Sequence, residues 1–152
     1  MPLQYESPEF NEELKKRVNA NGEYREKAKG MNWKTLITVK DVPFSTYSSY
    51  SDGELVERKH VAPNELEECK KKADFKIEIP TYDLSTEIAS GRKSIEKLFL
   101  SGAVKLEGAI FKALQYRAAA ELIAKITADL TNESIIPSKE EFTKMLREHG
   151  LF

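Results

Sequence analysis

Residues 98–108 read LFLSGAVKLEG, and this stretch gives the clearest indication of a fold. Gly102 and Gly108 flank a short alternating segment in which Val104 and Leu106 share one face. A strand places alternate side chains on opposite faces, and glycine allows the backbone to turn sharply at either end. The pattern predicts a brief strand with one apolar face, preceded by a short apolar helix.

Four further strands are predicted on the N-terminal side of this segment. Residues 33–42 (WKTLITVKDV) are dense in β-branched residues, and residues 75–79 alternate between apolar and charged side chains. Residues 44–50 and 54–62 are two extended segments separated by a Ser-Asp-Gly turn. An Asp-Gly pair between extended segments is a strong hairpin signal. The chain should therefore contain five strands.

Helices are predicted around these strands from apolar residues at helical spacing and from capping residues. The expected helices cover residues 8–21, 23–29, 63–72 and 81–91, a short segment from Ser94, a single long helix at 109–130, and a C-terminal helix at 138–148. Strands and helices are grouped instead of strictly alternating. This order predicts an α/β fold of the α+β type, with one mixed or antiparallel sheet covered by helices on one face, in a single domain over residues 1–152.

Composition excludes several classes of protein. The 24 Lys and Arg residues nearly balance the 25 Asp and Glu residues, so no broad attraction to nucleic acid is expected. The single cysteine permits no internal disulfide, and the N-terminus lacks the pattern of a signal peptide. Charged residues interrupt the longest apolar stretch, which argues against a transmembrane segment. We therefore expect a cytoplasmic protein.

Residues suited to catalysis or metal binding are few and isolated. Cys69, His60 and His149 have no partner at the spacing of a metal site, and no motif identifies a base for Cys69. Both histidines are expected to be solvated. The sequence thus predicts no catalytic residue, no metal and no cofactor.

An ordered pattern from Ala73 to about Leu122 resembles the sterol carrier protein lipid-binding family. The positions that carry the resemblance are Asp74, Gly91, Phe99, Gly102, Val104, Leu106 and Gly108. The resemblance implies a five-stranded mixed sheet backed by helices, with an apolar tunnel between them for fatty acids, acyl chains or sterol-like ligands. It brings no catalytic residues. The chain departs from the family pattern by continuing through a further C-terminal helix.

Apolar side chains where helices should face the last strands are the candidate walls of such a tunnel. They are Leu84, Ile88, Leu98, Phe99, Val104, Leu106, Ile110, Phe111 and Leu114. Each of them also fits an ordinary packed core.

The C-terminal helix is a candidate lid over the tunnel. Phe142, Met145 and Leu146 form its apolar stripe, and Leu151 and Phe152 follow. The alternative is that this helix simply docks on the helical layer.

Three functions remain open from the sequence. The first is non-catalytic binding, with transfer, of an apolar small molecule by a monomer or homodimer that contacts membranes transiently. The second is an interaction or dimerisation module with a filled core, in which Tyr47 and Tyr50 are exposed on the hairpin and contact the partner. The third is a small hydrolase or thioesterase.

Overall fold

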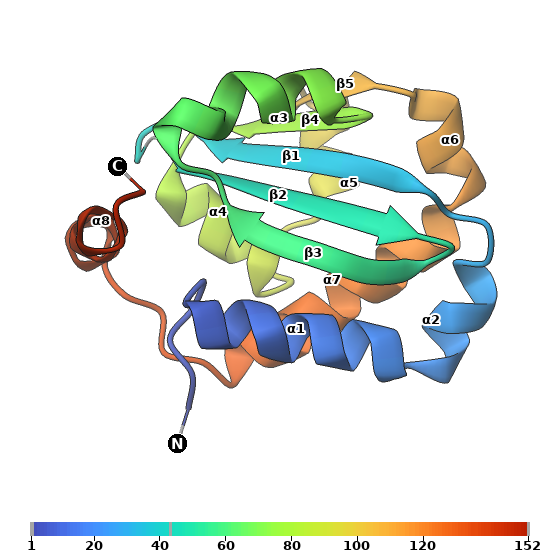
Figure 1. Cartoon of the computed structure of the whole chain (residues 1–152), viewed down its shortest axis with the longest axis horizontal. Helices are drawn as coiled ribbons and strands as arrows, with labels where there is room; N and C mark the ends of the chain where they lie inside the picture. Colours follow the sequence, from blue (N-terminus) through green and yellow to red (C-terminus); the bar gives the residue numbers. More distant parts are fainter. Residues whose placement is uncertain (1, 43, 152) are drawn as a thin grey trace.

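The computed structural model describes residues 2–42 and 44–151, so Phe152 of the predicted lid lies outside the described residues (Figure 1). Along the chain the elements are α1 (Pro8–Ala20), α2 (Gly22–Lys27), β1 (Trp33–Val39), β2 (Phe44–Ser51), β3 (Glu54–His60), the 3-10 turn η1 (Pro63–Glu65), α3 (Leu66–Lys72), β4 (Phe75–Ile79), α4 (Tyr82–Ala89), α5 (Ile95–Leu100), β5 (Lys105–Gly108), α6 (Ile110–Gln115), α7 (Arg117–Asn132) and α8 (Lys139–Glu148).

The strands form one five-stranded mixed sheet in the order β3-β2-β1-β4-β5. β1 pairs with β4 in parallel, and the other three neighbouring pairs are antiparallel. Because β4 returns beside β1 after the β2–β3 hairpin and α3, the sheet grows on both sides of β1. The predicted α+β class and five-stranded mixed sheet are confirmed.

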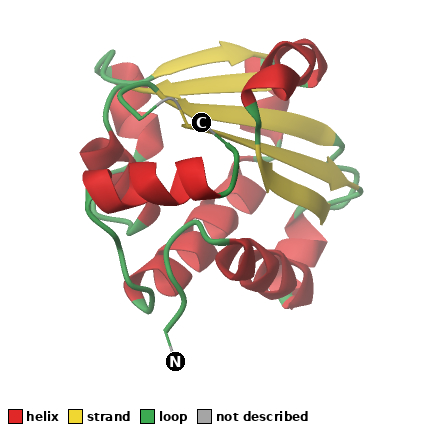
Figure 2. Ribbon diagram, turned by 60° about the vertical axis from the view of Figure 1, so that its left-hand side comes forward, coloured by secondary structure: helices red, strands yellow, loops and turns green. Residues whose placement is uncertain are grey.

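Helices lie on both faces of the sheet, which corrects the prediction that they cover one face. The main core contains Trp33, Val39 and Phe75 on one face and is covered by α1, α4, α7 and α8. On the opposite face α3 covers a smaller cluster that includes Leu36 and Cys69 (Figures 1 and 2). The sequence of α3 is mostly polar, so it did not indicate that this helix covers the opposite face of the sheet.

The β2–β3 hairpin turns at Asp52 and Gly53, as the Asp-Gly pair predicts. Asp52 has φ 48° and Gly53 has φ 83°, and two positive φ values suit the right-handed twist of the flanking strands. The hydroxyl of Tyr24 donates to the carbonyl oxygen of Gly53 at 2.7 Å, which fixes α2 against the turn.

The predicted long helix at 109–130 is wrong, because the chain breaks at Tyr116 into α6 and α7. Tyr116 has φ −107° and ψ 26°, outside the helical range. Its ring packs edge-on against Trp33 with centroids 5.7 Å apart. The stretch lacks Gly and Pro, so this tertiary contact, which helical periodicity does not show, accompanies the break.

Gly108 marks the closest approach between two strand ends. It has φ 127°, and a Cβ atom there would overlap the carbonyl oxygen of Asp74. The Asp74 carboxylate accepts a hydrogen bond from the backbone N–H of Lys34 at 2.8 Å. The glycine and aspartate of the sequence pattern therefore fix the junction of β1, β4 and β5.

Candidate functional site

Five of the first six predicted wall residues, all except Phe99, belong to the main core or pack against it. Val104 belongs to the main core, and Leu84, Ile88, Leu98 and Leu106 pack against it while remaining half-buried. Phe99 is also half-buried. These side chains come from α4, α5 and the β5 region, and together they give an apolar layer that is incompletely covered.

The three remaining wall residues face solvent in this structure. Ile110 is 42% exposed, Phe111 89% and Leu114 61%, all on α6. Ala113, on the other side of the same helix, packs against the main core. α6 therefore sits on the core with its small side chain and turns its large apolar side chains outward.

The predicted lid residues lie within or against the core. Phe142 and Leu146 are fully buried, and Met145 is half-buried. The ring of Phe142 stacks on Tyr82 at 4.8 Å and meets Phe44 edge-on at 4.9 Å. Ser138 and Glu141 form the predicted capping box that begins α8. α8 thus docks firmly at the end of the sheet opposite α6 (Figure 1).

Two surface hollows are found near the N-terminal segment. One, of about 400 Å³, lies between that segment and α8 and includes Met145 and His149 in its lining. The other, of about 560 Å³, lies along α1 and includes Leu3 and Lys16. Neither is lined by a predicted wall residue, so these hollows are not the predicted tunnel.

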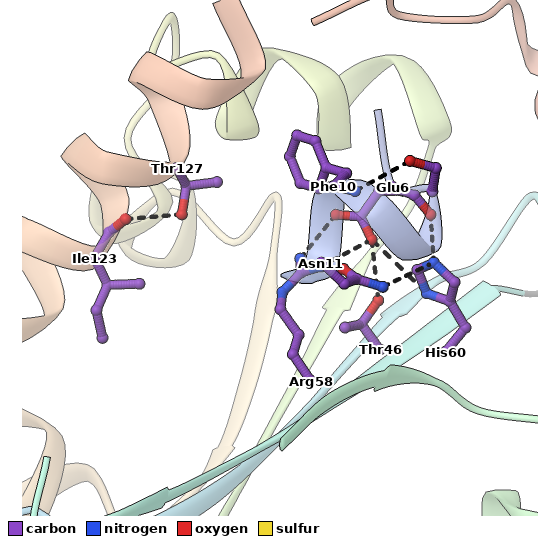
Figure 3. A network of polar contacts seen from close by, with 9 residues as sticks. Glu6, Phe10, Asn11, Thr46, Arg58, His60, Ile123 and Thr127 are labelled. Carbon is purple, nitrogen blue, oxygen red and sulfur yellow. Dashed lines mark hydrogen bonds and ion pairs between the residues drawn. The ribbon is translucent and has the colours of Figure 1, made fainter. Parts of the chain in front are cut away.

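Buried charges join the N-terminal segment to the sheet. Arg58 on β3 donates through Nη2 to Oε1 of Glu6 at 2.7 Å, and its Nη1 donates to the side-chain oxygen of Asn11. The hydroxyl of Thr46 donates to Glu6 Oε2 at 3.5 Å. Figure 3 shows these side chains converging between α1 and the sheet. Glu6 has φ 61°, a left-handed conformation that this network holds in place.

His60 belongs to the same network, which corrects the prediction that it is solvated. Its side chain is 7% exposed. Nε2 donates to the carbonyl oxygen of Glu6, and Nδ1 lies 3.8 Å from Glu6 Oε2. Arg58 and His60 are two residues apart on β3 and so lie on the same side of the strand. This spacing could have predicted that the two side chains act together. Nothing in the sequence indicated Glu6 as their partner.

Electrostatics within this network favour one protonation state. Burial alone raises the pKa of Glu6, but the nearby Arg58 and His60 and the hydrogen bonds it accepts hold it below its ordinary value. Burial lowers the pKa of His60, and attraction to Glu6 opposes this only in part. The network therefore holds a charged Glu6–Arg58 pair beside a neutral imidazole.

The other residues considered for catalysis share no hydrogen bond with this network among the described residues. Cys69 is buried under α3, and burial raises the pKa of its thiol, which disfavours the thiolate needed for attack. His149 is exposed at the end of α8. Among residues 2–42 and 44–151, no three His, Cys, Asp or Glu residues are grouped so as to hold a metal ion.

Tyr47 and Tyr50, proposed above as exposed contacts of the hairpin, are both buried. Tyr47 belongs to the cluster under α3, and Tyr50 packs edge-on against Trp33 at 6.4 Å. The two sheet faces each bury one of them, because residues three apart on a strand lie on opposite sides. The hairpin therefore offers no tyrosine surface to a partner.

Comparison with known families gives one decisive match. The family described as the SCP-2 sterol transfer family matches residues 11–121, which is most of the chain. This chain belongs to the SCP-2 sterol transfer family. The matched region runs from α1 into α7, so the greater part of α7 and all of α8 extend beyond the region that the SCP-2 sterol transfer family defines.

Solved structures share the fold at low sequence identity. A crystal structure of sterol carrier protein 2 is 20% identical and has a TM-score of 0.67, with 80% of this chain and 95% of that chain covered. A conserved hypothetical protein from Thermus thermophilus, described as possibly a sterol carrier protein, is 18% identical with a TM-score of 0.65, over 88% of this chain and 92% of that one. The ubiquinone synthesis protein UbiJ-SCP2 is 15% identical with a TM-score of 0.51, over 76% and 92%. No curated protein matches the chain.

Within the part of the chain that the structure describes, no helix combines the length and the apolar character needed to cross a bilayer.

Proposed function

We propose that this chain binds a lipid or another apolar small molecule without covalent change and transfers it. The observation that carries the proposal is the match of residues 11–121 to the SCP-2 sterol transfer family. The half-buried apolar side chains of α4, α5 and β5 support it, because they form an apolar layer that is not fully closed.

Apolar contact alone supplies enough free energy for such binding. Burial of a methylene contributes about 0.8 kcal/mol, so a sixteen-carbon chain gains on the order of 10 kcal/mol before the cost of association is subtracted. Walls of leucine, isoleucine and phenylalanine discriminate weakly between ligands of similar size. We therefore propose a class of ligand, fatty acyl or sterol-like, and not a single compound.

We place the ligand between the sheet and the helices α4 and α5. Leu84, Leu98 and Leu106 would contact it from three elements. Ile110, Phe111 and Leu114 would complete the wall if α6 rotates about its short connections when the ligand enters. α8 would then act as the lid of the site at the other end of the sheet.

Ligand binding can be tested with delipidated protein and a fluorescent fatty acid. Leu98→Gln places an amide in the proposed wall and should weaken binding at least tenfold, because the amide loses its water on ligand entry. Val56→Gln, an exposed position on β3, is the matched control and should bind as the original chain does. Native mass spectrometry of the purified protein should also detect a co-purified lipid. Absence of saturable binding of both fatty acids and sterols by the folded chain would contradict the proposal.

The lid is tested by the rate of ligand release. Deletion of residues 138–152 should raise the off-rate of the fluorescent fatty acid. Because Phe142 and Leu146 are fully buried, this deletion also threatens the fold, and Met145→Gln at the half-buried position is a second test. An off-rate unchanged in a folded Met145→Gln variant would assign α8 to structural docking.

A further inference from the structure

The outer face of α6 is apolar, and none of residues 2–42 and 44–151 covers it. On a helix, residues 110, 111 and 114 fall within an arc of about 100°. Phe111 is 89% exposed, which is rare for a phenylalanine in a folded chain. Leu100, at the end of α5, is 75% exposed. We call the three exposed side chains of α6, Ile110, Phe111 and Leu114, the α6 surface.

Positive charge accompanies the α6 surface. Residues 92–117 contain six Lys and Arg and two Glu, a net charge of +4, whereas the whole chain has a net charge of −1. The rest of the chain therefore carries a net charge of −5. Lys112 follows Phe111 in the sequence of α6. Lys97 lies on α5, which the Glu96–Arg117 ion pair joins to the start of α7, directly after α6. Within the described residues, Lys97, Lys105 and Lys112 form no ion pair.

Other exposed apolar residues have acidic neighbours instead. Val56 on β3 stands between Glu54 and Glu57 in the sequence. Ile135, 57% exposed, follows Glu133 by two residues. Exposed apolar groups occur in several places, but the α6 surface combines them with unpaired cations.

We propose that the α6 surface docks on an anionic lipid bilayer. Apolar side chains inserted at the headgroup boundary, flanked by lysines that meet anionic headgroups, are the features of an interfacial helix. A six-residue helix whose large apolar side chains are exposed suits shallow insertion at the headgroup boundary. The inference goes beyond the proposed ligand function, because it concerns the surface that approaches the membrane and not the bound molecule.

The test uses the full chain, without added ligand, in co-sedimentation with vesicles. Vesicles of phosphatidylcholine with about one third phosphatidylserine should bind the chain, and vesicles of phosphatidylcholine alone should bind it at least tenfold more weakly. Phe111→Ser with Leu114→Ser should reduce binding to the anionic vesicles at least tenfold. Val56→Ser with Ile135→Ser, two exposed apolar positions elsewhere, is the matched control and should leave binding unchanged.

The charge contribution is tested separately. Lys97→Gln with Lys112→Gln should weaken binding about fivefold per lysine at low salt, and the difference should shrink as salt is raised. Lys27→Gln with Lys71→Gln, exposed lysines on α2 and α3, is the control and should have little effect.

Three outcomes overturn the proposal. They are no binding to either kind of vesicle, binding that the Phe111 and Leu114 changes do not affect, and a concentration-dependent dimer that these changes disperse. The last would make a second copy of the chain the partner. None of the changed positions is buried, so thermal unfolding should match the original chain and confirm folding. Since no ligand is added, failure here leaves the fatty acid titration as an independent test of the proposed function.

Discussion

Large apolar side chains are buried at one end of the sheet and exposed to solvent at the other. At one end, which we call the closed end, Phe10, Phe44 and Phe142 are buried among α1, β2 and α8. At the other, the open end formed by α5, β5 and α6, Leu100 and Phe111 face solvent. Both ends belong to one protein with one sheet, so the apolar character of a residue does not by itself decide where it lies.

The difference follows from the size of the elements that meet at each end. α1 and α8, of 13 and 10 residues, each bury one stripe against neighbouring elements and leave a polar face outward. α5 and α6 have six residues each, and β5 has four. Elements this short have apolar residues on more than one side and too few neighbours to cover them all. The open end therefore retains apolar surface available for ligand or membrane.

The largest effect that distinguishes the ends is expected from truncation of an aromatic ring. Phe142→Ala should lower the free energy of unfolding by about 3–5 kcal/mol, because it leaves a cavity between Tyr82 and Phe44. Phe111→Ala should change it by no more than about 0.5 kcal/mol. Urea unfolding monitored by circular dichroism measures both. Equal losses at the two positions would remove the distinction between a closed and an open end.

The buried ion pair of the closed end should be nearly as costly to break. Arg58→Met leaves Glu6 buried without its partner and should cost about 3 kcal/mol. The double variant Arg58→Met with Glu6→Gln should recover part of this loss, since no uncompensated charge remains. Arg17→Met, which breaks an exposed pair with Glu133, is the control, with an expected loss of about 0–1 kcal/mol. A single variant at Arg58 as stable as this control would show that the pair contributes nothing to the closed end.

The open end has one tightly packed point, at Gly108. Gly108→Ala should destabilise the chain by about 3 kcal/mol, because the new Cβ would meet the carbonyl oxygen of Asp74. Gly102→Ala also has a positive φ but has open space around its Cβ, so about 1 kcal/mol is expected. The difference in thermal stability between the Gly108→Ala and Gly102→Ala variants measures the cost of the steric overlap at Gly108. Equal losses would show that β5 moves away from β4 without cost.

The smallest effect concerns pH and tests the closed end alone. Folding lowers the pKa of His60 from its ordinary value of 6.5. Just below pH 6.5 the imidazole therefore binds a proton more readily in the unfolded chain than in the folded chain, and this lowers the free energy of unfolding. Its contribution is present above pH 6.5 and is lost as the pH falls further. Glu6 has a pKa lowered from 4.5, so its contribution is present above pH 4.5 and is lost in more acidic solution.

His60→Gln should therefore make the free energy of unfolding nearly independent of pH between about 7.5 and 5.5. The loss of stability below about pH 4.5, which comes from Glu6, should remain in this variant. Asn64→Gln, which changes an exposed residue without adding or removing a titratable group, is the control and should preserve the whole profile. Urea titrations at each pH provide the data. A steep profile above about pH 5.5 that persists in His60→Gln would place its origin in another group.

Much of the fold was predictable from local signals. The Asp-Gly turn, the alternation of residues 75–79 and the Ser138–Glu141 capping box each depend on neighbours within a few residues, and all three are confirmed. The candidate site was predictable only in part. Leu84, Leu98 and Leu106 pack against the core, whereas Ile110, Phe111 and Leu114, which were predicted as walls of the same tunnel, face solvent.

The sequence by itself determined the strands, most helices, their caps and the resemblance to a lipid-binding family, since these depend on short-range spacing of side chains and turns. Only the tertiary structure decided which apolar residues stay exposed, where the helix at 109–130 breaks, and that Glu6 meets Arg58 and His60 across more than 50 residues of chain. Such contacts depend on which elements happen to be neighbours in space. A buried charge pair or an uncovered helix face follows from that arrangement, and no local pattern along the chain records it.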